Sequence, residues 1–251
     1  MNQSLSTVLK RRALELIRET KPSPLLVSLF LFAINSIVSL LTMYLSGYYD
    51  VAQTIMDLIF AGKEITSAEI FELTARHTST GGTILVFALS LCVSVISVGF
   101  TWYCYRVVRG EKPEAKSIFD GFGSFFKIIR LQIATGFLVA VQLVLFIVPG
   151  IIASIRYSQA VYVMYEHPEY GVLQCIRESG RMMRGYKWEY FMLLLSFIGW
   201  VLVGALISTF IPLAVLDIWI NIYMGLATAL FHVHLMRAGL SGEEHRDSSV
   251  I

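Results

Sequence analysis

Charged side chains are scarce in this sequence, and that scarcity excludes an ordinary water-soluble domain. Only 15% of the 251 residues are Asp, Glu, Lys or Arg, and 56% are apolar. Soluble domains average about 25% charged and about 45–50% apolar residues. The net charge of +2 gives no indication of a nucleic-acid partner. Because the apolar excess requires a non-aqueous solvent, the composition predicts a membrane protein.

Cysteine is rare, and the chain lacks the short motifs of familiar catalytic sites. Cys92, Cys104 and Cys175 are isolated, which excludes a disulfide framework or a CxxC pair. No nucleophile elbow, phosphate loop or HExxH motif occurs. His232 and His234 are two positions apart, so on a helix they point about 200° apart and cannot hold one metal ion. We therefore expect no metal, no cofactor and no catalytic residue.

Long apolar runs are what the chain has instead. A helix needs about 20 apolar residues to cross the hydrocarbon core of a bilayer, and six segments approach this length. The sequence predicts an all-α membrane bundle in one domain, 1–251. It comprises a basic segment (1–23), the bundle (24–237) and a tail without regular structure (238–251). The predicted spans are Pro24–Leu45, Thr83–Cys104, Phe126–Val148, Ile151–Tyr165, Tyr190–Ile211 and Ile218–Met236.

Only Pro149 and Gly150 separate the third predicted span from the short fourth one. The two runs together would make a helix of about 60 Å, twice the thickness of the hydrocarbon core. Proline removes a helical donor, and glycine permits a sharp reversal. We therefore predict a tight hairpin that turns at these two residues, and the sequence leaves open whether it crosses the membrane completely.

Positive charge is distributed unevenly between the two sides of the predicted bundle. One side, called the basic side below, carries five Lys or Arg before the first span, six in 105–131, four in 166–189 and two after the last span. The opposite side carries only Lys63 and Arg76, while Arg156 falls within a span. Basic loops stay in the cytoplasm, so the pattern predicts that both termini are cytoplasmic.

Three segments outside the spans have helical patterns of their own. The loop Gly47–Gly82 contains a capping box at Thr66–Glu69, which predicts a short helix to about His77. On the basic side, Leu5–Arg18 and Pro168–Trp188 have the pattern of amphipathic helices. Such helices lie on anionic lipid with their basic face at the head groups.

Four sequence elements resemble one family. They are Val148–Ile152, Arg156–Ser158, Glu178–Trp188 and Ser196–Trp200. Together they resemble the DUF975 (domain of unknown function) family of bacterial membrane proteins, over about 10–237. The most specific block contains Ser179, Gly185, Trp188, Gly199 and Trp200. The resemblance implies a six-helix protein of the bacterial cytoplasmic membrane without an established activity, and it supplies no catalytic residues. The sequence departs from the family after Trp219, where Ile-Asn replaces the usual Pro-Tyr.

Polar and small residues form stripes along several spans. On a helical wheel, five residues of the sixth span fall within about 80° of one another: Asp217, Asn221, Gly225, Thr228 and His232. In the fourth span a broad face contains Arg156, Gln159, Tyr162 and Glu166. Polar groups avoid lipid, so we expect these faces to converge inside the bundle. The predicted intramembrane polar site consists of Arg156, Gln159, Asp217, Asn221, Thr228 and His232.

Arg156 makes the most specific prediction within this site. A cation inside a span costs about 2.5–3.5 kcal/mol and is normally paired or hydrated. Asp217 is an acid near the outer end of the sixth span, and Asn221 is one turn further. We therefore predict that Arg156 contacts the Asp217 and Asn221 end of the stripe.

Two functional hypotheses follow. In the first, the protein is non-catalytic and associates with anionic lipid head groups, with a partner membrane protein or with a second copy through its basic helices. In the second, it is a transporter or channel for a small solute or lipid, and the polar stripe lines the path. Transporters often carry broken helices at corresponding positions of two repeats, and only one break is visible here, which favours the first hypothesis.

Overall fold

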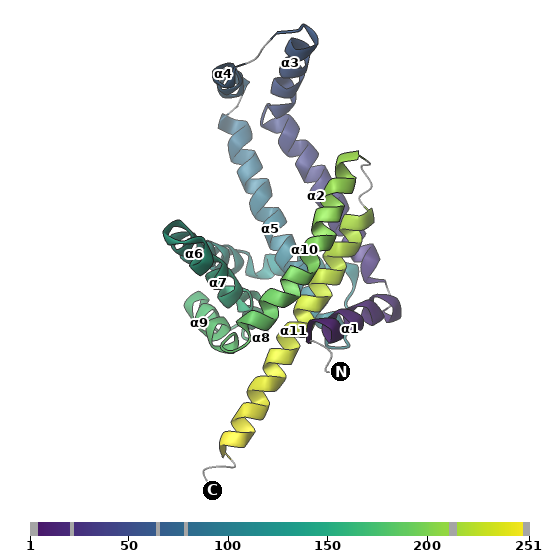
Figure 1. Ribbon diagram of the computed structural model, residues 1–251, viewed down its shortest axis with the longest axis vertical. Coiled ribbons are helices and arrows are strands. Elements are labelled where there is room, and N and C mark those ends of the chain that lie inside the picture. Colours follow the sequence, from purple (N-terminus) through teal and green to yellow (C-terminus); the bar gives the residue numbers. More distant parts are fainter. Residues whose placement is uncertain (1–4, 21–22, 64–65, 78–79, 211–214, 248–251) are drawn as a thin grey trace. The chain divides into compact units, whose positions relative to one another are not determined.

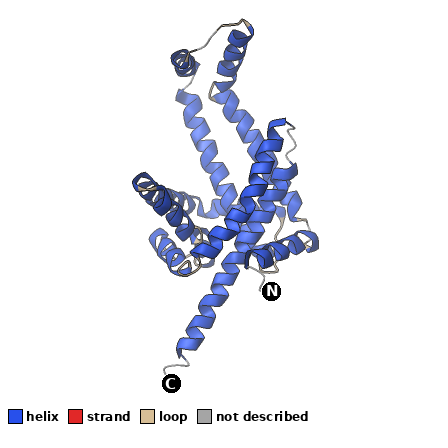
Figure 2. Ribbon diagram, in the orientation of Figure 1, coloured by secondary structure: helices blue, strands red, loops and turns tan. Residues whose placement is uncertain are grey.

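Helix is the only regular secondary structure over the part of the chain that the computed structural model describes, residues 5–20, 23–63, 66–77, 80–210 and 215–247 (Figure 2). Helices satisfy their own backbone hydrogen bonds, which an apolar solvent requires. Six stretches are long and apolar enough to cross a membrane: Pro24–Leu45, Thr80–Val108, Ala115–Leu145, Ile147–Glu166, Lys187–Gly204 and Leu216–Gly239. The prediction of an all-α, multi-pass membrane protein with six spans is confirmed.

The elements are labelled in Figure 1. In chain order they are α1 (Leu5–Glu19), α2 (Pro24–Leu45), α3 (Tyr48–Phe60), α4 (Ser67–His77), α5 (Thr80–Val108), η1 (Ala115–Ser124), α6 (Phe125–Leu145), α7 (Ile147–Tyr157), α8 (Ala160–Glu166), α9 (Val172–Met182), α10 (Lys187–Phe210) and α11 (Val215–Asp247). The chain divides into two compact units. The smaller unit is 30–94, and the larger unit consists of 1–29 and 95–251.

The smaller unit contains two helices outside the spans. Gly47, with a φ of 76°, ends α2 and starts α3, which was not predicted because polar residues interrupt its apolar run. The predicted capping box of α4 is present. The Thr66 N–H donates to the Glu69 carboxylate at 2.9 Å, and the Glu69 N–H donates to Thr66 Oγ1 at 3.4 Å. The hydrogen bond from the Thr66 backbone holds the pKa of Glu69 below its ordinary value.

In the larger unit, α11 lies at the centre and α10 runs along it (Figure 1). The predicted tail is helical as far as Asp247, and residues 248–251 lie outside the described part. The predicted helix over Leu5–Arg18 is α1, but its apolar face packs on α10 and α11 rather than facing lipid alone. Lys10 Nζ donates to Ser196 Oγ at 3.2 Å, and burial lowers the pKa of Lys10.

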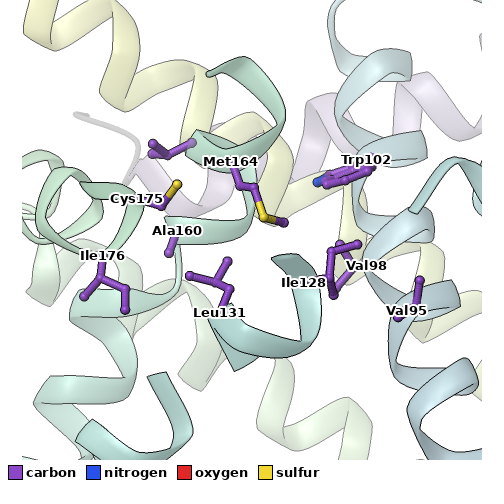
Figure 3. Packing of buried hydrophobic residues seen from close by; sticks show 10 residues of the cluster. Val95, Val98, Trp102, Ile128, Leu131, Ala160, Met164, Cys175 and Ile176 are labelled. Atoms are coloured by element: carbon purple, nitrogen blue, oxygen red, sulfur yellow. The ribbon is translucent and has the colours of Figure 1, made fainter. Parts of the chain in front are cut away.

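A buried apolar cluster joins α5, α6, α8 and α9 (Figure 3). The cluster consists of Val95, Val98, Trp102, Ile128, Leu131, Ala160, Val163, Met164, Cys175 and Ile176. Trp102 Nε1 donates to the carbonyl oxygen of Val161 at 3.0 Å, which satisfies its polar edge. The predicted amphipathic helix at 168–188 is confirmed as α9, and this cluster covers its apolar face.

The hairpin between the third and fourth spans is present, but its turn is not at Pro149 and Gly150. The chain reverses at Phe146, which is extended (φ −158°, ψ 141°), and α7 begins at Ile147. Pro149 therefore lies in the first turn of α7, where its missing N–H costs no helical bond. Gly150 lets α7 approach α6, because a Cβ there would come within 2.6 Å of Leu143 Cδ1. The prediction placed the turn too late because proline is tolerated inside a first turn.

Gly99 sets the distance between α5 and η1. A Cβ at this position would lie 1.8 Å from the carbonyl oxygen of Ile118, which is backbone and cannot rotate away. One at Gly121 would come within 2.9 Å of the carbonyl oxygen of Val95. The two glycines thus let η1 lie directly on the backbone of α5.

Gly99→Ala should therefore destabilise the protein by about 3 kcal/mol or more, because the backbones must separate. The measurement is thermal unfolding of the full chain in detergent micelles. Gly136→Ala is the matched control: it also lies within a long helix, but a Cβ there meets nothing within 4 Å. Equal unfolding temperatures for the two variants would contradict this packing.

Candidate functional site

The fourth span is interrupted where α7 ends and α8 begins. Ser158 and Gln159 form a tight turn between the two helices. Such a break frees backbone groups that would otherwise pair within the helix, and an apolar surrounding makes unpaired groups costly. The polar side chains of the site gather around this break.

Ser179 of α9 pairs with two backbone groups at the break. Its hydroxyl donates to the carbonyl oxygen of Arg156 at 2.8 Å and accepts from the Gln159 N–H at 3.2 Å. Ser179 is fully buried, so water does not perform this role. Ser179, a residue of the most specific family block, therefore links α9 to the interrupted span. The sequence did not reveal this role.

Gln159 and His232 are fully buried and hydrogen-bonded to each other across α8 and α11. His232 Nδ1 lies 3.1 Å from Gln159 Oε1, and His232 Nε2 lies 3.3 Å from Glu166 Oε2. The second Glu166 oxygen accepts a hydrogen bond from the hydroxyl of Tyr105. We call Gln159, His232, Glu166 and Tyr105 the buried polar network.

Aromatic rings enclose this network. The Tyr162 ring stacks on the His232 imidazole, with centroids 4.6 Å apart and planes inclined by 17°. The Tyr105 ring meets the same imidazole edge-on at 5.5 Å. Tyr162 also donates to Thr228 Oγ1 at 3.2 Å, which places Thr228 one turn from His232 beside the network. The predicted convergence of the stripes therefore occurs at Gln159, Thr228 and His232.

A cleft of about 590 Å³ opens beside the network, at the ends of α8 and α9 that belong to the basic side. Glu166, 11% exposed, belongs to both the network and the cleft. The lining is Val163, Glu166, His167, Glu178, Arg181, Met182, Arg184, Tyr186, Leu235, Met236, Ala238 and Gly239.

The charges in the cleft are only partly compensated. Arg181 Nη2 lies 2.8 Å from Glu178 Oε1, so this pair is internally neutral. Arg184 is exposed, and within the described part of the chain no carboxylate lies at ion-pair distance from it. Gly185 follows in the left-handed conformation (φ 87°) and turns the chain into α10. The arrangement offers a cation beside an apolar floor.

The structure does not bring together the other half of the predicted site. Arg156 is exposed and lies over Gly180 of α9, where a Cβ would come within 2.8 Å of its Nε. Asp217 lies beside Gly204 of α10, and the amide of the exposed Asn221 donates to the Asp217 carbonyl oxygen in its own helix. The predicted contact of Arg156 with Asp217 and Asn221 is therefore wrong. A helical wheel gives the direction of a residue around its own helix axis, but it does not show which neighbouring helix the residue faces.

Most other polar side chains of the spans bond to their own helix. Each hydroxyl or amide donates to a carbonyl three or four residues earlier, as for Asn35, Ser90, Ser94, Thr101, Thr135 and Gln142. Such bonds satisfy a polar group without a partner helix or water. These residues therefore do not by themselves indicate a hydrated passage.

Three further residues of the family block lie on α10. Trp188 is 69% exposed near the start of the helix, a position typical of the aromatic belt at a membrane surface. Gly199 faces open space, since a Cβ there meets nothing within 4 Å. Trp200 packs against Trp219 of α11, with ring centroids 5.7 Å apart.

Tyr105 and Glu166 are the network residues absent from the predicted site. Both lie in the last turn of a helix, where the sequence assigned them to the start of a loop. The face shared by Gln159 and Glu166 was the available signal for Glu166. No sequence signal connected Tyr105 to α8, because the contact joins residues 61 positions apart.

Ser179→Ala should lower the free energy of unfolding by about 1–3 kcal/mol, since it leaves two buried backbone groups without partners. Thermal unfolding in detergent micelles measures the loss. Ser154→Ala is the control, because the exposed Ser154 donates only to Ile151 within α7. A loss as small as that of the control would contradict the bridging role.

Comparison with known proteins finds one family whose model matches part of the chain. Residues 130–238 match a family described as "Protein of unknown function (DUF975)". No curated protein and no solved structure matches the chain. The matched stretch includes Gln159, Glu166, Ser179 and His232 and every residue of the cleft except Gly239, whereas Tyr105 lies outside it. Residues 130–238 are therefore similar to the DUF975 family, the family that the sequence elements indicated.

Proposed function

We propose that this chain is a non-catalytic membrane protein that binds the head group of an anionic lipid in the cleft between α8, α9 and α11. The observation that carries the proposal is the uncompensated charge of Arg184 beside an apolar floor, at a span end. In this proposal the basic side is cytoplasmic, and the membrane is the cytoplasmic membrane of a bacterium.

The size and lining of the cleft support this proposal. Its volume of about 590 Å³ falls within the usual range of small-ligand sites, about 300–1,000 Å³. Val163, Met182, Leu235 and Met236 supply apolar contacts for the upper part of a lipid chain. Arg184 supplies a planar donor that pairs with a phosphate oxygen through two N–H groups.

Position in the membrane supports it as well. The cleft lies at the end of α8 and at Gly239, where the sixth span within α11 ends. Head groups lie at this depth, and basic residues near them attract anionic lipid by about 1 kcal/mol each. Lys127 contributes a second cation nearby, since its Nζ donates to the Pro168 carbonyl oxygen between α8 and α9.

Transport through the bundle fits the polar residues less well. Gln159, Thr228 and His232 bond to other side chains, and Asn221 bonds to its own helix. Arg156, Asn221 and Thr228 do not line the cleft. Association with a partner membrane protein or a second copy through the basic surface is compatible with lipid binding, and remains a prediction.

Arg184→Gln should weaken binding of dihexanoyl phosphatidylglycerol about tenfold, because it removes the charge-assisted hydrogen bonds to the phosphate. Titration calorimetry of the full chain in neutral detergent micelles gives the dissociation constant. Arg177→Gln is the matched control: Arg177 is an exposed arginine of α9 that does not line the cleft.

Three results would separate the explanations. Equal weakening by both arginine variants would indicate a general surface charge effect and contradict a site in the cleft. Equal affinity for dihexanoyl phosphatidylcholine would contradict selection for an anionic head group. Inorganic phosphate that binds as tightly as the lipid would show that the apolar floor does not contribute.

A further inference from the structure

The buried polar network contains an acid and a base in direct contact at the floor of the cleft. His232 is fully buried, and both of its ring nitrogens have partners. Glu166 is the network residue that also lines the cleft. The hydrogen bonds of this pair determine how many protons it holds.

Ser158 fixes the orientation of the Gln159 amide. The Ser158 hydroxyl donates to the Ile155 carbonyl oxygen at 2.8 Å and accepts a hydrogen bond from Gln159 Nε2 at 2.9 Å. Gln159 Oε1 is therefore the atom that faces His232. Because this oxygen has no hydrogen, Nδ1 of His232 carries the proton of that hydrogen bond.

The contact between His232 Nε2 and Glu166 Oε2 then requires one more proton. Without it, a nitrogen lone pair would face a carboxylate lone pair at 3.3 Å. With it, either an imidazolium donates to the carboxylate or a neutral carboxyl donates to the imidazole. Both forms have a total charge of zero, and loss of the proton leaves a charge of −1 under the cleft.

The structure assigns a proton-binding site to His232 and Glu166, and its protonation controls binding of an anionic head group in the cleft above it. The second part rests on the proposed function. An anion near Arg184 is repelled by the charge of −1 and not by the neutral pair. Binding of the lipid should therefore take up a proton, and a proton should favour binding to the same degree.

Aromatic and charged groups surround the pair. The Tyr162 ring stacks on the imidazole, and the Tyr105 hydroxyl donates to the carboxylate. Arg109 lies over the Tyr105 ring at 5.7 Å. The other titratable or charged groups near the pair are Tyr165, whose ring packs on Tyr105, and Cys104 and Tyr190, which lie near Tyr162. His167 follows Glu166 in the chain, and Glu178, Arg181, Arg184 and Tyr186 line the cleft with it.

The test is the pH dependence of phosphatidylglycerol binding by the full chain in neutral detergent micelles. The phosphodiester of dihexanoyl phosphatidylglycerol keeps one negative charge between about pH 6 and about pH 9, the range in which a histidine switch operates. We expect the dissociation constant to rise with pH, by about tenfold in total. Calorimetry in buffers of different ionisation enthalpy should show uptake of protons on binding.

Glu166→Gln should remove this pH dependence whatever it does to affinity. The amide donates to His232 Nε2 without a titrating proton, so no negative charge develops. His232→Gln serves the same purpose if the first variant does not fold. His234→Gln should keep the pH dependence, because the His234 ring contacts Tyr186 and Phe231 outside the network and does not line the cleft. Loss of pH dependence in His234→Gln, or its retention in Glu166→Gln, would overturn the inference.

A measurement without lipid separates the proton site from the proposed function. The wild-type unfolding temperature should fall from about pH 6 to about pH 9 more than that of Glu166→Gln, because the native state loses a proton that links α8 to α11. If lipid does not bind but this difference appears, the proposed function fails and the proton site stands. If the difference is absent, the proton site is overturned.

Discussion

Backbone polar groups at membrane depth need a partner within the protein, and the interrupted fourth span shows how this constraint organises the larger unit. The break between α7 and α8 frees the Arg156 carbonyl and the Gln159 N–H, and one serine hydroxyl from α9 pairs with both. This places α9 against the span that precedes it. Once α9 is fixed, the turn after it carries Arg184 to the cleft.

The same break redirects the polar face of the fourth span. A straight helix would spread its polar residues along one line, whereas the turn at Ser158 and Gln159 points Gln159, Tyr162 and Glu166 toward α11. Their partners on α11, Thr228 and His232, are one turn apart. The break in the fourth span thus produces the network that connects three elements, α5, α8 and α11.

Glycine supplies the close approaches that bring these elements together. Gly99 brings η1 onto the backbone of α5, and Gly225 of α11 faces Cys104, whose sulfur would lie 2.9 Å from a Cβ at that glycine. Small residues have this role in membrane bundles because lipid offers no hydrophobic force between helices. Since Tyr105 follows Cys104 on α5, the contact at Gly225 also brings its hydroxyl within reach of Glu166.

The sequence by itself determined that the protein lies in a membrane, where its spans are and where short helices begin. These features depend on apolar length, proline and capping residues that are close in the chain. Pro24–Leu45 was predicted with the bounds that α2 has, and the capping box at Thr66 was read directly. Only the tertiary structure decided which polar residues meet. Arg156 and His232 both lie on polar faces, yet one packs on Gly180 and the other on Gln159 and Glu166. The physical reason is that helical periodicity gives a direction around one axis, whereas a contact also depends on the break, the crossing and the depth of the neighbouring helix.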